Sequence, residues 1–510
     1  MLSDHAALRA HSEGFTMNSA LQMSQSMSLT DYRAQVMGCW LGKAIGGTLG
    51  MPFEGNTNLL DLTFYTPVPT EMLPNDDLDL QVVWACVLDK MESPYVDKHV
   101  LSQAWLDHVE FPWDEYGVAI RNLRSGLKAP QSGSFDNWFT HSMGAPIRSE
   151  IWACLAPGNA ELAAQYAYED GCVDHGDEGL WAEVFLSALQ SEAFVERDPS
   201  TLLRSALSRL PETCRTRRAV EDTWRWWRDS GDWKLVRSQI LGAHGRDNFT
   251  DAPMNIAFVV LGWLAGEGDF SRTICIAVNC GMDTDCTGAT VGALMGILDP
   301  ECIPGRWIEP IGRSLVLSPG IVNLEAPKSL DGFTDMVLNL RDRLGEIHEQ
   351  ESTPMQSVER FQIDVEAEYA DDMPLTDSAP ELTAPKTITL PGTVAHLATS
   401  KFDRDIVVVR YNFHLSEDRY VRVMLNTPEE CRVWVDGEFA FQRSGGVMAP
   451  SFHRVPKNQS IDLTLSAGEH VLTAAIRKPS EKQAAEWVVG VGDHKTMQWI
   501  TDAFFVPESR

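Results

Sequence analysis

The sequence predicts a multidomain protein in which an all-α helical domain precedes an all-β jelly-roll or sandwich domain. Apolar residues recur every three or four positions from about residue 29 to 347, whereas apolar and polar residues alternate after about residue 357. The length of 510 residues and the 44% hydrophobic content suit two or three globular domains. We therefore divide the chain into a mobile N-terminal arm (1–28), a helical domain (29–348), a linker (349–356) and a β-sandwich (357–510).

The helical half begins with a capping signal. Ser28 and Asp31 have the spacing of a capping box, so the first helix is expected to start at residue 29. Helical apolar spacing marks five segments, at residues 31–50, 79–91, 161–171, 178–194 and 252–268. Glycine recurs at every fourth position of the first segment, at Gly38, Gly42, Gly46 and Gly50. This bare stripe indicates either close packing against another helix or a backbone that approaches a ligand.

The second half is predicted to consist of strands. Alternating segments lie at residues 360–369, 405–415, 420–426, 431–441, 460–478 and 486–493. Asp436-Gly437 and Ala467-Gly468 are turn signals between them. Trp434 and Phe441 are candidates to stack on a sugar, but aromatic residues in sandwich strands more often fill the core.

Charge and cysteine content limit the classes of partner. The chain has 42 Lys+Arg against 72 Asp+Glu, a formal net charge of −30, which disfavours nucleic acid and anionic membrane surfaces as partners. Its ten cysteines form no CxxC pair, so we expect reduced thiols and a cytoplasmic protein. The first 28 residues lack the pattern of a signal peptide, and no apolar run reaches the roughly 20 residues that span a bilayer.

Two acidic clusters stand at predicted helix starts, and they consist of Asn75, Asp76, Asp77 and Asp79 in one and of Asp283 and Asp285 in the other. Either cluster alone is explained by helix capping, because acids in a first turn suit the helix dipole. Together they favour a cation, since neighbouring carboxylates repel one another. Oxygen ligands suit Mg²⁺ or Mn²⁺ better than zinc, and two such helix starts brought together could hold a pair of ions.

The residues after the second cluster are small, and they are Gly288, Ala289, Gly292, Ala293 and Gly296. They would let that helix lie deep in a bundle, so we expect the acids to hold metal and the small residues to place it. A different reading, the all-α isoprenoid synthases, requires the motif DDxxD. The spacing Asp76-Asp77-Leu78-Asp79 does not match it.

Four segments resemble the ADP-ribosylglycohydrolase family, the dinitrogen-reductase-activating type of all-α di-magnesium hydrolase. They are "GCWLGKAIGGTLGMPFEG", "NDDLDLQ", "VDHGDEGLWAEVFLSAL" and "CGMDTDCTGATVGALMGIL", within roughly residues 31–300. The last is the most specific, because it matches the family's G-x-D-x-D-[ST] helix. The resemblance implies an ADP-ribosylglycohydrolase-like helical fold and two Mg²⁺ ions, with Mn²⁺ possible. The β half, with less specific motifs, looks like jelly-roll domains attached to glycoside hydrolases.

The sequence departs from the family pattern at several positions. Gly47 replaces the usual Asp of the first motif, and Asn75 stands where Thr or Ser usually begins the metal motif. Leu78 and Cys286 likewise stand where the family commonly has a hydroxyl side chain. A thiol is a poor ligand for Mg²⁺, so either Thr287 or water substitutes or one metal position is more manganese-like. These departures concern the substrate more than the metal.

Carried over residue by residue, the resemblance implies three sets of site residues. The metal ligands would be Asn75, Asp76, Asp77, Asp283, Asp285, Cys286 and Thr287. The catalytic residues would be Glu54, Asp77 and Asp283, with Glu54 transferring a proton or gating the entry to the metals. The substrate-binding residues would be His141, Ser142, Met143, Gly144 and His175, although a packed His175 is equally consistent. We expect Arg148 to form a surface ion pair rather than meet a phosphate.

The predicted function is metal-dependent hydrolysis of an N- or O-glycosidic bond to ribose or a related sugar, through water activated by two metals. The substrate would be a free or protein-attached ribosyl or ADP-ribosyl group. Two alternatives stay open: a glycoside hydrolase acting on a non-ADP-ribosyl sugar in catabolism, and a non-catalytic binder of ADP-ribose or carbohydrate. No nucleic acid or membrane partner is expected, and a homo-oligomer is possible.

Overall fold

The computed structural model describes residues 28–344 and 355–505 and contains two compact units. Of the described residues, the first unit is helical and comprises 28–110 and 140–344; the second carries the strands and comprises 111–139 and 355–505. The predicted order, helical domain and then all-β region, is therefore confirmed. The predicted arm, except for Ser28, and most of the predicted linker lie outside the described residues. The predicted domain boundaries remain a prediction.

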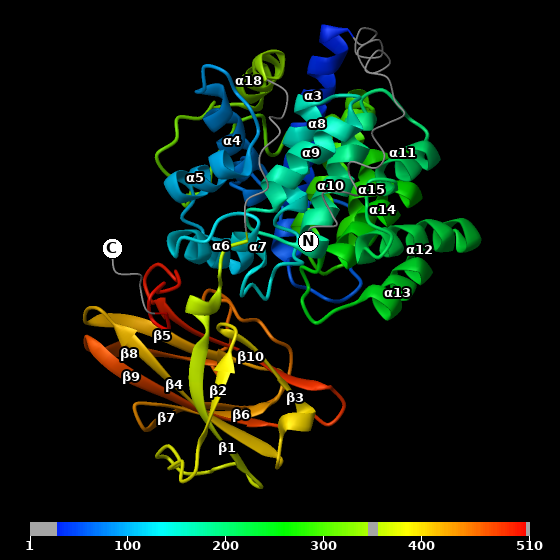
Figure 1. Cartoon of the computed structure of the whole chain (residues 1–510). Helices are drawn as coiled ribbons and strands as arrows, with labels where there is room; N and C mark the ends of the chain where they lie inside the picture. The colour runs from blue at the N-terminus through cyan, green and yellow to red at the C-terminus, as the bar shows by residue number, and fades with distance from the viewer. Residues whose placement is uncertain (1–27, 345–354, 506–510) are drawn as a thin grey trace. The chain divides into compact units, whose positions relative to one another are not determined.

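The helical unit contains α3 (Leu29–Gly50) and α4 (Asp76–Asp89), both labelled in Figure 1, and α16 (Thr284–Leu298), which packs against α3. Its other α-helices are α5 (Lys98–His108), α8 (Ser149–Leu155), α9 (Ala160–Gly171), α10 (Asp177–Glu192), α11 (Pro199–Leu207), α12 (Arg215–Ser230), α13 (Trp233–His244), α14 (Ala252–Gly266), α15 (Phe270–Asn279), α17 (Gly305–Ile308) and α18 (Leu330–Arg343). Its 3₁₀ helices are η2 (Met51–Phe53), η3 (Pro146–Arg148) and η4 (Pro300–Cys302).

Helix α3 begins where the capping signal predicts. The Ser28 hydroxyl accepts a hydrogen bond from the Asp31 N–H at 3.1 Å, and the Ser28 carbonyl accepts one from the Tyr32 N–H. These bonds satisfy N–H groups that the first turn of a helix leaves unpaired.

The glycine stripe of α3 packs directly on α16. A Cβ added to Gly288 would lie 2.5 Å from the Gly46 carbonyl oxygen, and one added to Gly42 would overlap the carbonyl of Gly292. The same relation joins Gly38 to Gly296. The packing explanation of the stripe is confirmed, since the two backbones touch with no room for a side chain.

The second unit contains α6 (Asp114–Arg124), α7 (Gln131–Ser134), η5 (Glu359–Phe361), η6 (Thr399–Lys401) and ten strands in two antiparallel sheets. One sheet has the order β2-β1-β4-β9-β6-β7 and the other β3-β10-β5-β8. The strands are β1 (Ile363–Ala370), β2 (Lys386–Leu390), β3 (Val394–Ala398), β4 (Ile406–Leu415), β5 (Arg419–Asn426), β6 (Glu430–Val435), β7 (Glu438–Ser444), β8 (Ser460–Leu465), β9 (Gly468–Arg477) and β10 (Ala484–Asp493).

The inward faces of the two sheets form the core of this unit. β4 presents Val407, Val409 and Tyr411 to it, as period-two alternation requires. Trp434 and Phe441 are both buried, which favours packing over sugar stacking. Asp436 and Gly437 both have positive φ and join β6 to β7, as the turn signal predicts.

Two further properties bear on the sequence-based expectations. All ten cysteines are free thiols. Among the described residues, no helix combines the length and apolar character needed to cross a bilayer.

Candidate active site

The two acidic clusters lie at the N-termini of α4 and α16. The Asn75 side chain caps α4 by accepting a hydrogen bond from the Asp77 N–H at 2.9 Å. Asp283 occupies the capping position of α16, but its side chain makes no capping hydrogen bond. Its own N–H instead donates to Asn255 Oδ1 at 3.3 Å. Capping therefore explains Asn75 and leaves the carboxylate of Asp283 unexplained.

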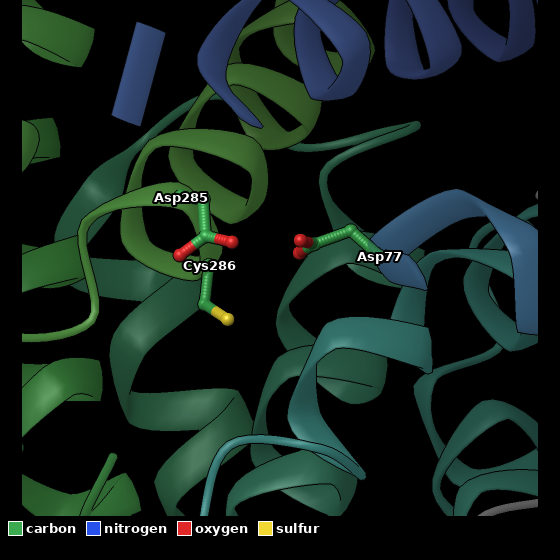
Figure 2. A group of neighbouring side chains, drawn as sticks. All are labelled: Asp77, Asp285 and Cys286. Carbon is green, nitrogen blue, oxygen red and sulfur yellow. The ribbon is translucent and has the colours of Figure 1, made fainter. Parts of the chain in front are cut away.

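Side chains from both helix starts converge (Figure 2). One ligand atom each from Asp77, Asp285 and Cys286 lie within 4.8 Å of one another, and Figure 2 shows the Asp77 carboxylate directed at the other two. A second group with the same spacing consists of Glu54, Asp283 and Asp285. Asp285 belongs to both groups, so the two groups share one carboxylate. Such sharing is the arrangement expected of a bridging ligand.

Three carboxylate oxygens of this site are buried without a hydrogen bond among the described residues, although Lys43 forms an ion pair with one of them, Asp77 Oδ1, at 3.6 Å. Both oxygens of Asp77 and Oδ1 of Asp285 are buried and accept no hydrogen bond among the described residues. Burial raises the pKa of Asp285 well above its usual range, and the Asp283 carboxylate raises it further. Burial and then Glu54 do the same to the pKa of Asp283. A divalent cation would relieve both penalties, so the residues present fit one.

Asp76 and Asp79 take different positions in the same turn. Asp76 is partly exposed, and burial and the adjacent Asp77 raise its pKa well above the usual range. Asp79 is buried and accepts a hydrogen bond from the Ser318 N–H at 3.2 Å. Asp76 thus shares the electrostatic environment of the site, whereas Asp79 fixes a loop.

Backbone hydrogen bonds bring Glu54 to the start of α16. The Gly55 N–H donates to the Met282 carbonyl at 2.9 Å, and the Met282 N–H donates to the Asn56 carbonyl at 2.8 Å. Gly281 has positive φ, and a Cβ there would lie 2.5 Å from the Asn56 oxygen. These contacts hold the exposed Glu54 beside the buried acids, at the margin of the site.

The other predicted ligand positions lie at the same helix start. The Thr287 hydroxyl is buried and donates to the Thr284 carbonyl at 3.2 Å, which leaves its oxygen able to accept. The Thr284 hydroxyl donates to the Gly50 carbonyl at 2.8 Å, which ties α16 to the end of α3.

The predicted substrate-binding loop is mostly occupied by internal contacts. The Ser142 hydroxyl is buried and accepts a hydrogen bond from the Thr250 hydroxyl at 2.9 Å. Met143 is buried, and the Gly144 carbonyl accepts from an arginine. His141 Nδ1 is buried with no hydrogen-bond partner among the described residues. His141 is therefore the member of this loop whose polar atom is most available to a ligand.

His175 and Arg148 belong to a buried polar network. His175 is fully buried, with Nδ1 at 3.1 Å from an Asp174 oxygen, and a Cβ on Gly179 would lie 2.5 Å from its ring. Arg148 pairs with Asp170 at 3.0 Å and with Asp174 at 2.8 Å and has no exposed surface. The expectation of a surface ion pair for Arg148 was wrong, because two buried carboxylates bind the guanidinium inside the protein.

Sequence reasoning missed two charged residues behind Asp77. Lys43 Nζ lies 3.0 Å from Glu150 Oε2 and 3.6 Å from Asp77 Oδ1, and all three side chains are buried. The signal for Lys43 was a charge within the otherwise apolar, glycine-rich stretch 36–47, where an unpaired ammonium would be costly. Glu150 gave no signal, since its partner lies more than 100 positions away in the chain.

The sequence and the structure of the chain are both similar to those of known proteins. A sequence model described as ADP-ribosylglycohydrolase matches residues 28–343, which include both acidic helix starts. The chain belongs to the ADP-ribosylglycohydrolase family. A solved structure described as "ADP-ribosylglycohydrolase-related protein complex" is similar at 21% identity, covering 62% of this chain and 99% of that chain, with a TM-score of 0.43. No curated protein matches the chain. Membership of the family implies hydrolysis of a glycosidic bond and action on ribosylated substrates.

Proposed function

We propose that the protein is a divalent-cation-dependent hydrolase that cleaves an N- or O-glycosidic bond to ribose or a related sugar. The observation that carries this proposal is the Asp77 carboxylate. It is fully buried, is directed at Asp285 and Cys286, and has no hydrogen-bond partner on either oxygen among the described residues. The Lys43 ammonium, 3.6 Å from Asp77 Oδ1, is shared with Glu150, so these three buried groups keep an excess negative charge that a divalent cation would offset. The family supports the type of bond that is cleaved.

Two cation positions are proposed. One would use Asp77, Asp285 and Cys286, and the other Glu54, Asp283 and Asp285. Asp76, Asn75 and Thr287 border these groups and complete the proposed ligand set. The ions would be Mg²⁺ or Mn²⁺, which when bound supply an activated water and an anchor for the vicinal hydroxyls of ribose.

The chain's own residues supply orientation and proton transfer. Asp77 and Asp283, each at the start of a rigid helix, would orient the ribosyl group and the attacking water relative to one another. Glu54 is exposed at the margin of the site, so it can exchange a proton with solvent and with a leaving group. An oxocarbenium-like transition state would develop positive charge, which the surrounding carboxylates stabilise.

The substrate is proposed to be a small molecule or a protein-attached group that carries ribose. Both an ADP-ribosyl group and a simpler ribosyl glycoside are compatible with the site. The net charge of −30 disfavours nucleic acid as the partner. The ten free thiols support a reducing compartment, and we propose the cytoplasm. A non-catalytic binder is less well supported, because binding alone does not require paired, mutually repelling carboxylates.

Calorimetric titration of ADP-ribose in Mg²⁺ and then in EDTA tests the substrate class. Binding that requires Mg²⁺ would support an ADP-ribosyl group. Binding of Mg²⁺ without binding of ADP-ribose would point to another glycoside. Absence of binding of both Mg²⁺ and Mn²⁺ would refute the proposal, and Asp285→Asn is the matched variant expected to lose cation binding.

A further inference from the structure

Lys43, Asp77 and Glu150 share one buried space behind the proposed cation site. The Lys43 ammonium therefore lies between the carboxylates of Asp77 and Glu150, and it is closer to Glu150 than to Asp77. Lys43 Nζ forms ion pairs with Glu150 Oε2 at 3.0 Å and with Asp77 Oδ1 at 3.6 Å. Neither contact has the geometry of a hydrogen bond, so the shorter distance alone marks Glu150 as the nearer of the two ion-pair partners.

Glu150 is itself fixed by two amide side chains. Gln81 Nε2 donates to Glu150 Oε2 at 3.0 Å, and Gln190 Nε2 donates to Glu150 Oε1 at 3.1 Å. Gln81 also donates to the Asp77 carbonyl at 2.8 Å and accepts from the Ile151 N–H at 2.7 Å. Both oxygens of Glu150 are engaged, whereas neither oxygen of Asp77 accepts a hydrogen bond from a described residue.

We infer that Glu150 is a positioning residue that keeps the Lys43 ammonium off Asp77, so that the Asp77 carboxylate stays available to a divalent cation. This inference rests on the cation site of the proposed function. An ammonium in full contact with Asp77 would compete with the cation for the same oxygens and would repel it across the buried space. Glu150 prevents both effects, because it binds the ammonium and balances its charge.

A purely structural role for the same residues leads to different expectations. If Lys43 and Glu150 only stabilised the packing of α3 against α8, loss of either charge would lower stability without a specific effect on cation binding. If Lys43 itself held Asp77 in place, loss of Lys43 would weaken cation binding. We expect instead that loss of the Glu150 charge weakens cation binding and that loss of the Lys43 charge does not.

The test is a titration of the full chain and its variants with Mn²⁺, in which electron paramagnetic resonance measures the free ion. Glu150→Gln is expected to weaken Mn²⁺ binding by about tenfold or more, the range seen for residues behind metal ligands. Lys43→Met is expected to bind Mn²⁺ as tightly as the natural protein or more tightly. The double variant, which combines Lys43→Met with Glu150→Gln, is expected to recover most of the Mn²⁺ affinity that Glu150→Gln loses, because it removes the competing ammonium.

The Glu150→Gln side chain can be accommodated locally. Gln190 Oε1 is buried and has no hydrogen-bond partner among the described residues, so rotation of the Gln190 amide would let that oxygen accept from the new amide at position 150. Glu169→Gln is the matched control. It breaks a second largely buried lysine pair, Lys98–Glu169 at 3.2 Å, and should lower stability without changing Mn²⁺ affinity.

Three results would overturn the inference. The first is a folded Glu150→Gln variant with natural Mn²⁺ affinity, and the second is a double variant that does not recover. The third is a tenfold loss of affinity in Lys43→Met, which decides the matter even if Glu150→Gln fails to fold. Failure of the natural protein to bind any divalent cation is a separate result, because it removes the proposed function and the inference together.

Discussion

The side-chain amide of Asn75 occupies the space beside Gly47, where any Cβ would overlap Asn75 Nδ2. Both positions depart from the family pattern that the sequence resembles, which has Asp at the first and Thr or Ser at the second. The two departures are therefore linked by volume. Asn75 caps α4 through the Asp77 N–H, so the contact reaches the proposed cation site directly.

A side chain at position 47 is expected to displace Asn75. Gly47→Asp should lower the unfolding temperature by several degrees, since loss of a cap and overpacking each cost about 1–2 kcal/mol. It should also weaken Mn²⁺ binding. Adding Asn75→Thr restores the family's pair of residues and should recover both properties. The linkage would be contradicted if the double variant lost as much stability as the sum of the losses of Gly47→Asp and Asn75→Thr measured separately.

The contact between α3 and α16 predicts intolerance of any side chain along the glycine stripe. Gly42→Ala would drive a methyl group into the Gly292 carbonyl, so we expect a loss of about 3 kcal/mol or more in the free energy of unfolding. Gly242→Ala in α13 is the control, because a Cβ there meets nothing within 4 Å. That control should gain about 0.5–1 kcal/mol. Similar urea midpoints for the two variants would refute the packing argument.

The Cys286 thiol among the proposed ligands predicts that the site binds soft metal ions. The natural protein should bind Cd²⁺ with the ultraviolet absorption of a cadmium–thiolate bond. Cys286→Ser should lose that absorption and at least about tenfold in Cd²⁺ affinity, while it keeps Mg²⁺ binding. Cys302→Ser should behave like the natural protein. An unchanged absorption in Cys286→Ser would exclude the thiol from the site.

Within the buried network around Arg148, Asp174 contributes stability that is lost in acid. Burial raises the pKa of Asp174, but the Arg148 guanidinium and then His175 outweigh it and lower the pKa to about 2. Because this value lies below that of an unfolded Asp, the stabilisation is present above about pH 4 and is lost as the pH falls through 2. Its size is about 2–3 kcal/mol.

The Asp174→Asn variant isolates this effect. It should be less stable than the natural protein at pH 7, and the difference in urea midpoint should shrink as the pH falls from 4 towards 2. Asp331→Asn, which removes an exposed partner of Arg33, should show little difference at any pH. A difference for Asp174→Asn that does not vary with pH would contradict the assignment.

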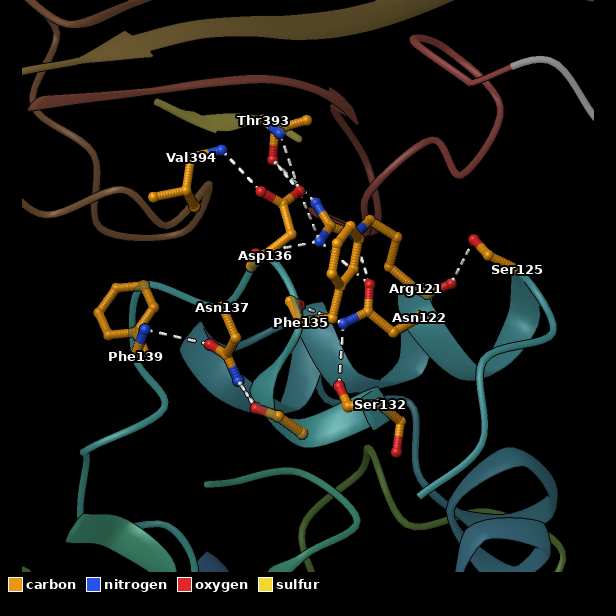
Figure 3. A network of polar contacts seen from close by, with 11 residues as sticks. Arg121, Asn122, Ser125, Ser132, Phe135, Asp136, Asn137, Phe139, Thr393 and Val394 are labelled. Carbon is orange, nitrogen blue, oxygen red and sulfur yellow. Dashed lines mark hydrogen bonds and ion pairs between the residues drawn. The ribbon is translucent and has the colours of Figure 1, made fainter. Parts of the chain in front are cut away.

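Asp136 joins residues 111–139 to the strands of the second unit (Figure 3). Its carboxylate accepts hydrogen bonds from the Thr393 hydroxyl at 2.6 Å and the Val394 N–H at 2.7 Å, and it pairs with Arg121 at 3.0 Å. Asp136→Asn breaks a buried ion pair, so it should cost about 3–5 kcal/mol and expose the segment to proteases. Asp403→Asn, at an exposed pair with Lys386, should cost under about 1 kcal/mol. Equal resistance of Asp136→Asn and Asp403→Asn to proteolysis would refute the role of Asp136.

Local patterns in the sequence predict most of the fold. Regular apolar spacing marks α3, α4, α9, α10 and α14, and alternation marks the central strands of both sheets. β2 and β3 were missed because they are five-residue strands, in which alternation is too brief to be recognised. Helical periodicity reports local structure and not which unit a helix packs with, so it does not by itself place residues 111–139 in either unit.

The candidate site was predictable only in part, for a related reason. The acids at the starts of α4 and α16 repel one another, and this cost is visible in the sequence without knowledge of the fold. The partners of Arg148 and Lys43 are set by which helices meet in the bundle. A carboxylate such as Glu150 therefore looks like a surface acid until the packing of α8 against its neighbours is known.

The most direct test of the central claim is sugar release from an ADP-ribosylated or ribosyl substrate in Mg²⁺, after removal of the metal by EDTA, and after its return. Turnover that stops with EDTA, resumes with Mg²⁺ or Mn²⁺, and is absent in Asp77→Asn is the predicted result. Turnover that persists in EDTA, or in a folded Asp77→Asn variant, would contradict the account.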